Sequence, residues 1–192
     1  MPAIFELNEF ESLPLWGQVL IAARMVRRGV LAVLPDATSD FRDRALAACA
    51  TIERCAVKGE LPGDDERALA DAMPLRERAE TRVAAVAGAL WWAIDACRAA
   101  RGAQDFPVDS TVTNSSLRAI GELGEDPRVS RLQLTVLVAS DFDLVRFACS
   151  EISVGRYDAL TAHVLARLAP VHPLTLVETP MRGTHHAERG VR

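Results

Sequence analysis

Apolar side chains recur at helical spacing along most of this chain. The clearest stripe lies between Pro14 and Pro35, where an apolar residue returns every three or four positions: Leu15, Val19, Ala22, Val26, Val30 and Val33. Such a stripe predicts an amphipathic helix, which Pro14 opens and Pro35 closes. Gln18 and the three arginines of this stretch lie mostly off the stripe.

Capping and breaking residues predict where the next helices begin and end. The second helical segment has Thr38 or Ser39 as its N-cap and Gly59 just beyond its end. Residues 65–101 form another helical region, which Pro74 interrupts. Because proline breaks a helix interior, we expect a short helix there, followed by a long one that begins near Pro74.

Three more helices are predicted in the second half of the chain, over residues 108–123, 126–152 and 157–169. Within the second of these, the sequence RLQLTVLV (residues 131–138) nearly alternates like a half-buried strand. A helical stripe fits the same residues, and a lone strand would have no partner elsewhere in the chain. We therefore favour the helix.

Together these segments predict an all-α fold, a single-domain bundle of about six or seven helices. The length of 192 residues and the apolar content of 49% suit one globular domain. We expect the bundle to occupy residues 1–176. Residues 177–192 show no periodicity and are expected to form a disordered tail.

The chain is expected to work in the cytoplasm without a membrane span. Residues 13–35 have the length of a span, but three arginines lie at their middle. The N-terminus carries glutamates instead of the basic start of a signal peptide. The net charge of −4 argues against a nucleic-acid-binding protein. Reduced, buried thiols are expected because no Cys-x-x-Cys pair occurs among Cys49, Cys55, Cys97 and Cys149.

Four short stretches resemble a known family. They are LPLWGQVLIAARM (residues 13–25), AIDAC (93–97), VDSTVTNSSLRAI (108–120) and DPRVS (126–130). In their order and spacing they are similar to the YjaG family of bacterial all-helical proteins, over roughly residues 7–152. The resemblance implies a helical bundle in the bacterial cytoplasm, and it implies no particular activity.

The sequence ALWWAIDACRAARG contains the first candidate site. Trp91, Asp95 and Arg98 are three or four residues apart and therefore share one face of a helix. Such a group could bind a ligand beneath an indole ring. We favour the structural alternative, in which Trp91 or Trp92 packs in the core and Asp95 forms a surface ion pair with Arg98.

A polar run follows at residues 110–116, although serine, threonine and asparagine are poor helix formers. Capping explains its first one or two residues. The rest either face solvent, which we favour, or line a polar seam against a neighbouring helix, where Arg118 could supply a charge to a small ligand. The candidate ligand-binding residues are Trp91, Trp92, Asp95, Asn114, Ser115 and Arg118.

No catalytic residue, metal site or cofactor is predicted. Asp141 and Asp143 lie in an apolar helix, but residues two positions apart point away from each other and cannot form one site. No histidine follows a glutamate by three positions, as a carboxylate di-iron bundle requires. The motifs of activated serine nucleophiles, phosphate-binding loops and zinc proteases are missing.

Three functional hypotheses follow. The first, which suits the missing catalytic motifs, is a non-enzymatic binding or protein-interaction module. The second is a small-molecule-binding domain or enzyme that uses a polar seam around Asp95 and Arg118. The third is an immunity-type protein that neutralises a toxin. The partner is expected to be a protein or a small molecule, and a homodimer is compatible with the sequence. Neither nucleic acid nor a membrane is expected as a partner.

Overall fold

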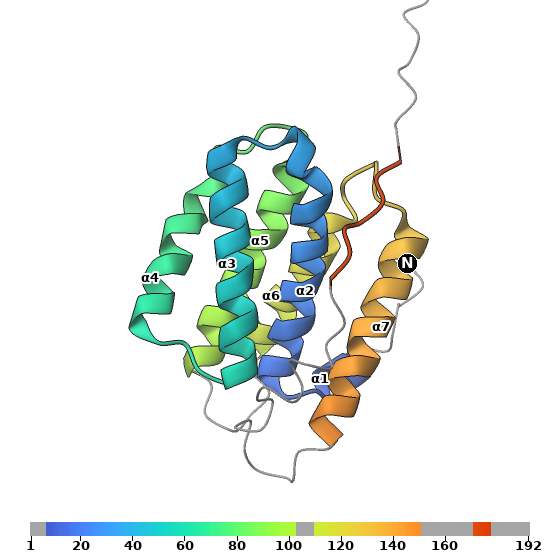
Figure 1. Ribbon diagram of the computed structural model, residues 1–192. Helices are drawn as coiled ribbons and strands as arrows, with labels where there is room; N and C mark the ends of the chain where they lie inside the picture. Colours follow the sequence, from blue (N-terminus) through green and yellow to red (C-terminus); the bar gives the residue numbers. More distant parts are fainter. Residues whose placement is uncertain (1–6, 103–109, 151–170, 178–192) are drawn as a thin grey trace, which may run out of the picture.

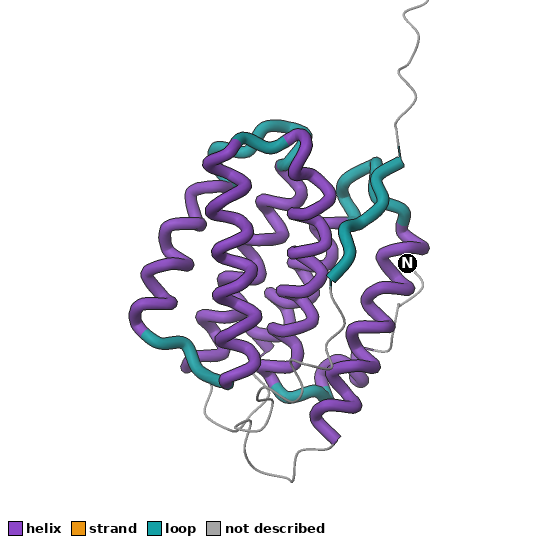
Figure 2. Tube along the Cα trace, in the orientation of Figure 1, coloured by secondary structure: helices purple, strands orange, loops and turns teal. Residues whose placement is uncertain are grey.

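The computed structural model describes residues 7–102, 110–150 and 171–177, and this part of the protein is a bundle of α-helices (Figure 1, Figure 2). Seven α-helices are present in these residues, which confirms the all-α fold. The helices are α1 (Leu7–Glu11), α2 (Leu15–Val33), α3 (Ser39–Lys58), α4 (Gly63–Ala72), α5 (Ala84–Gly102), α6 (Ser110–Leu123) and α7 (Arg131–Ser150). Two short 3-10 turns, Leu34–Asp36 and Met73–Leu75, follow α2 and α4.

The ends of α3 and the helical conformation of α7 agree with the predictions from the sequence. The Thr38 hydroxyl oxygen caps α3 by accepting a hydrogen bond from the Phe41 backbone N–H, 3.2 Å away. Gly59 ends the helix in the left-handed conformation, with a φ of 71°, which glycine adopts without strain. Residues 131–138 are helical, as predicted, and the β pairing in the described residues is one isolated bridge between Val129 and Leu176.

The start of α5 was predicted wrongly. Pro74 lies in the 3-10 turn after α4, and α5 begins only at Ala84. Between Leu75 and Val83, which are both buried, most side chains are charged or polar and exposed. These residues offer no apolar stripe that a helix could bury against the bundle, so they form turns instead.

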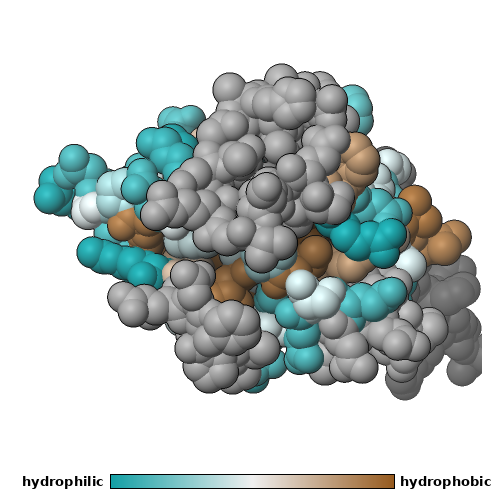
Figure 3. Space-filling view, turned by 90° about the horizontal axis from the view of Figure 1, so that it is seen from below, coloured by the Kyte–Doolittle hydropathy of each residue, from teal (hydrophilic) through white to brown (hydrophobic). Residues whose placement is uncertain are grey.

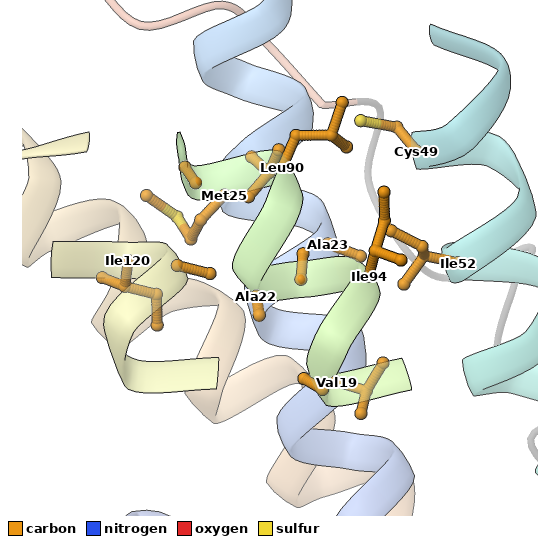
Figure 4. Close-up of a cluster of buried hydrophobic side chains, with 14 of the residues drawn as sticks. Val19, Ala22, Ala23, Met25, Cys49, Ile52, Leu90, Ile94 and Ile120 are labelled. Atoms are coloured by element: carbon orange, nitrogen blue, oxygen red, sulfur yellow. The ribbon is translucent and has the colours of Figure 1, made fainter. Parts of the chain in front are cut away.

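Helix α2 lies at the centre of the bundle and packs against α3, α5, α6 and α7 (Figure 1). Figure 4 shows where side chains of α2, α3, α5 and α6 meet in the core. Because neighbours surround α2, burial extends beyond its apolar stripe. Gln18, Arg24 and Arg28 are therefore buried, contrary to their expected position off the buried face.

The tightness of this packing can be tested at two helical glycines. A Cβ atom on Gly29 of α2 would lie 2.7 Å from Cδ2 of the buried Leu123, whereas a Cβ atom on the exposed Gly121 of α6 would meet nothing within 4 Å. We expect Gly29→Ala to lower the free energy of unfolding by about 1–3 kcal/mol through overpacking. We expect Gly121→Ala to raise it by about 0.4–1 kcal/mol by restricting the unfolded chain.

Urea denaturation of both variants measures these changes. Equal effects of the two substitutions would contradict the close approach of α2 and α6 at Gly29.

The segment 171–177 runs along α2 beside α7 (Figure 1). The Leu174 backbone N–H donates to the Arg28 carbonyl oxygen at 3.1 Å, and the Val177 N–H donates to the Arg128 carbonyl oxygen at 2.8 Å. The Leu174 side chain is buried. The helix expected over residues 157–169 and the tail beyond Val177 lie outside the described residues.

The described surface is mixed in character. Seen from the lower end of the bundle, hydrophilic and apolar residues alternate over the part of the surface that is coloured (Figure 3). Large apolar side chains are exposed at four positions: Leu132, Val136, Phe147 and Val177. No helix in the described ranges has both the length and the apolar character needed to cross a membrane.

Candidate functional site

The candidate residues lie along the contact between α5 and α6. Trp92 of α5 faces Arg118 of α6, and the Asp95 carboxylate accepts a hydrogen bond from the Ser115 hydroxyl at 2.6 Å. Residue numbers rise along α5 as they fall along α6, so the two helices are antiparallel. Asn114 is exposed one turn before Arg118. The structure thus brings the six predicted residues to one side of the α5–α6 pair.

Two arginines stack on the tryptophan pair. The Trp91 and Trp92 rings form an edge-to-face contact, with ring centroids 4.6 Å apart and planes at 89°. The Arg118 guanidinium carbon lies 4.6 Å from the Trp92 ring centroid, and the Arg76 guanidinium carbon lies 5.0 Å from the Trp91 centroid. These distances are typical of cation–π contacts. We call Arg76, Trp91, Trp92 and Arg118 the Trp–Arg strip.

Neither tryptophan is fully buried, which corrects the expectation that one of them fills the core. Both rings are half-buried, and Trp92 packs partly against the core while its indole N–H donates to Glu122 Oε1 at 3.4 Å. The buried face of α5 is formed largely by smaller side chains: Ala89, Leu90, Ala93, Ile94, Ala96 and Cys97. Close packing of these residues against α2 and α6 leaves the indoles at the margin of the bundle.

The predicted ion pair between Asp95 and Arg98 does not form. Arg98 Nε lies 2.6 Å from Glu66 Oε1 of α4, and Asp95 instead accepts the short hydrogen bond from Ser115. Glu66 also lies 3.7 Å from Arg101. Sequence spacing within one helix cannot show such a competitor, because α4 reaches Arg98 only through the tertiary fold.

The polar run of α6 lines an internal seam, and the favoured alternative, in which its later residues face solvent, is wrong for Thr113, Ser115 and Ser116, which are buried. The Thr113 hydroxyl donates to the Gln18 side-chain oxygen at 2.8 Å, and Gln18 Nε2 donates to the Leu13 carbonyl oxygen at 3.0 Å. Ser116 is fully buried, and its hydroxyl has no hydrogen-bond partner among the described residues. The seam therefore ties α6 to α2, whereas solvent reaches the Trp–Arg strip and Asn114.

A buried ionic cluster between α2 and α7 was missed. Asp141 is fully buried and lies 3.0 Å from Arg24 Nε and 3.1 Å from Arg28 Nη2. Arg28 Nη1 also donates to the His172 carbonyl oxygen at 3.3 Å, which connects the cluster to the segment 171–177. Asp143 is exposed, so the two aspartates point apart as predicted. The sequence signal that could have indicated this cluster was the pair Arg24 and Arg28, two charged residues four positions apart inside an apolar helix.

An ion pair beside this cluster joins α2 to α3. Arg27 pairs with Glu53, and burial raises the pKa of the Glu53 carboxyl even though Arg27 lowers it. Arg24 and Asp141 also act electrostatically on Glu53. The charged side chains at the contacts of α2 with α3 and α7 thus pair with one another, and these ion pairs hold the helices together.

The thiols agree with the prediction of reduced, buried cysteines. Cys49, Cys55 and Cys97 are free and fully buried, and Cys149 lies where side-chain surroundings are not described. Burial, followed by the charge of Glu53, raises the pKa of the Cys49 thiol. Within the described ranges, no group of three or more His, Cys, Asp or Glu side chains is placed to hold a metal ion.

Comparison with protein-family models, with curated proteins and with solved structures finds no match to this chain. The resemblance to the YjaG family therefore stays a prediction. The Trp–Arg strip places aromatic rings and positive charge at the protein surface.

Proposed function

We propose that this protein is a non-enzymatic interaction module that binds a partner protein through the Trp–Arg strip. The observation that carries the proposal is a half-buried pair of tryptophans flanked by two arginines on one side of the α5–α6 pair. Tryptophan and arginine are the residues most enriched among those that dominate binding energy at protein interfaces. Their rings and guanidinium groups are already held in place, which lowers the entropy lost on binding.

The charges of the strip indicate an acidic partner. Most arginines of the described chain pair with a carboxylate, for example Arg54 with Asp65 and Arg98 with Glu66. Neither Arg76 nor Arg118 has a carboxylate oxygen within 4.0 Å among the described residues. Their stacking on indoles leaves guanidinium N–H groups free to meet carboxylates of a partner.

A bacterial cytoplasm is the proposed location. The described thiols are unpaired and buried, as is usual for proteins of a reducing compartment.

Site-specific photo-crosslinking tests the proposal in the full chain. The exposed Asn114, one turn before Arg118, is replaced by a photo-crosslinking residue, and the exposed Ala47 of α3 serves as the control position. We expect a partner protein with an acidic segment to be crosslinked from position 114 and not from position 47. Added salt should reduce the yield, because screening weakens contacts between exposed charges.

Binding of the crosslinked partner is then measured for Arg76→Ala, Arg118→Ala and the control Arg131→Ala. Each strip variant should weaken binding about tenfold or more, a loss of about 1.4 kcal/mol or more. Arg131 is also exposed, lies on α7 and should be neutral. Equal crosslinking from both positions, or unchanged affinity of the strip variants, contradicts the proposal. A crosslinked toxin would make the protein an immunity protein, and a co-purified small molecule would favour the second hypothesis.

A further inference from the structure

The Glu122 carboxylate of α6 lies in a space that a glycine of α5 leaves open. A Cβ atom on Gly88 would lie 2.9 Å from Glu122 Oε2 and 3.3 Å from Glu122 Cδ, which is too close unless the carboxylate shifts. Gly88 is buried, and Glu122 is half-buried. The carboxylate can therefore occupy this place because residue 88 has no side chain. We call the space the Gly88 notch.

From the Gly88 notch the same carboxylate reaches the Trp92 ring. Glu122 Oε1 accepts the hydrogen bond from the Trp92 indole N–H at 3.4 Å. Gly88 and Trp92 are four residues apart on α5 and lie on one face of it, so a single carboxylate can fill the notch and meet the indole. The Arg118 guanidinium carbon lies over the same ring, 4.6 Å from its centroid. Side chains of α6 thus contact both the N–H edge and the face of Trp92.

Glu122 does not pair with the arginine nearest to it on α6. Arg118 precedes it by four residues, which is the usual spacing of an ion pair along a helix. In the part of the chain that the structure describes, no carboxylate oxygen lies within 4.0 Å of the Arg118 guanidinium nitrogens. An ion pair with Glu122 would engage the guanidinium group that an acidic partner needs. The position of the Glu122 carboxylate therefore decides whether Arg118 is available.

We propose that Gly88 and Glu122 are positioning residues of the Trp–Arg strip: the Gly88 notch holds the Glu122 carboxylate against the Trp92 indole N–H and away from Arg118. The inference rests on the proposed function of the strip. The indole cannot turn without losing its hydrogen bond, so the strip meets a partner in one arrangement and less entropy is lost on binding. The Arg118 guanidinium keeps its N–H groups for a carboxylate of the partner.

Gly88→Ala tests the notch in the full chain. The atoms nearest to the added methyl group belong to the end of a flexible side chain, so the carboxylate should move and the helices should stay in place. Alanine also favours a helix interior over glycine, so circular dichroism and the melting temperature should show a folded protein. In heteronuclear NMR of the isotope-labelled protein, the Trp92 indole N–H signal should shift upfield because it loses its acceptor. The loss of this signal in Trp92→Phe assigns it.

Three further variants separate positioning from a general effect on the fold. Gly121→Ala adds the same methyl group next to Glu122 in the chain, where it would meet nothing within 4 Å, and it should leave the Trp92 signal in place. Glu122→Ala should shift the signal as Gly88→Ala does. Glu122→Gln keeps an oxygen that accepts the indole N–H and should retain most of the wild-type signal. A Trp92 signal that stays in place in Gly88→Ala or Glu122→Ala, or that moves as far in Gly121→Ala, overturns the proposal.

Binding of a labelled poly-glutamate peptide, followed by fluorescence anisotropy, supplies the functional readout. Wild type and Gly121→Ala should bind it equally. Gly88→Ala should bind about tenfold more weakly, the effect expected of Arg118→Ala, because the displaced carboxylate competes for Arg118. Adding Glu122→Gln to Gly88→Ala removes the competing charge and should recover most of the binding.

The two readouts keep this inference apart from the proposed function. If the wild-type protein does not bind the peptide, binding of an acidic partner by the strip is contradicted, and the Trp92 signal alone decides the positioning role. If the wild-type protein binds and Gly88→Ala binds equally well, the proposed function stands and the positioning role of Gly88 and Glu122 is overturned.

Discussion

Replacing Asp141 with alanine is expected to lower the free energy of unfolding by about 3–5 kcal/mol, among the largest effects of any single substitution in this chain. The Asp141 carboxylate is the buried anion that meets both Arg24 and Arg28, at 3.0 and 3.1 Å. Both guanidinium groups have side chains no more than 6% exposed. Without the carboxylate, two positive charges remain in the interior close to each other. Urea denaturation measures the loss.

Asp143 supplies a matched control on the same helix. It is exposed, and Asp143→Ala should change stability by no more than about 0.5 kcal/mol. A triple variant, Arg24→Met, Arg28→Met and Asp141→Leu, separates charge from packing. Removing the whole cluster should restore most of the stability that Asp141→Ala loses, because a buried ion network is often no more stable than an apolar replacement. A triple variant as unstable as the single one would show that the hydrogen-bond geometry matters more than the stranded charges.

The helical fold was predictable because local signals and burial agree along most of the chain. Thr38 and Gly59 mark the ends of α3 by capping chemistry that depends on a few neighbouring residues. The strand-like pattern of residues 131–138 is resolved by the fold: Leu134 and Val138, one helical turn apart, are buried, whereas Leu132 and Val136 are exposed. Two of the alternating apolar residues therefore face solvent, which the alternation of apolar and polar residues could not indicate.

The candidate site was only partly predictable because its contacts join distant segments. The six candidate residues do lie along α5 and α6, since their positions on two helices follow from periodicity. Arg76 was not foreseen, because it belongs to a turn before α5 and reaches Trp91 only in the folded chain. The burial of Arg24 and Arg28 has the same cause. An amphipathic pattern predicts which face of α2 is apolar, and it does not show that neighbours enclose the other face as well.

Truncation of the core should reveal which apolar positions support the bundle. Ile94 of α5 is fully buried and points toward Ile52 of α3 (Figure 4). Ile94→Ala removes buried methyl and methylene groups at a place where α2, α3 and α5 meet, and the rigid surroundings cannot close the cavity completely. We expect a loss of about 2–5 kcal/mol in the free energy of unfolding, measured by urea denaturation.

Leu132→Ala is the control for this experiment, because Leu132 is 74% exposed although it stands in an apolar run of the sequence. The loss at this position should stay within about 0.5 kcal/mol. A large loss at Leu132 would mean that another part of the chain or a second molecule covers α7 in solution, and the exposed apolar face with Val136 and Phe147 would then be an interface. A small loss at Ile94 would instead show that the core around α5 relaxes to fill the cavity. The two substitutions therefore test the packing at the centre of the bundle and the exposure of α7 at its surface.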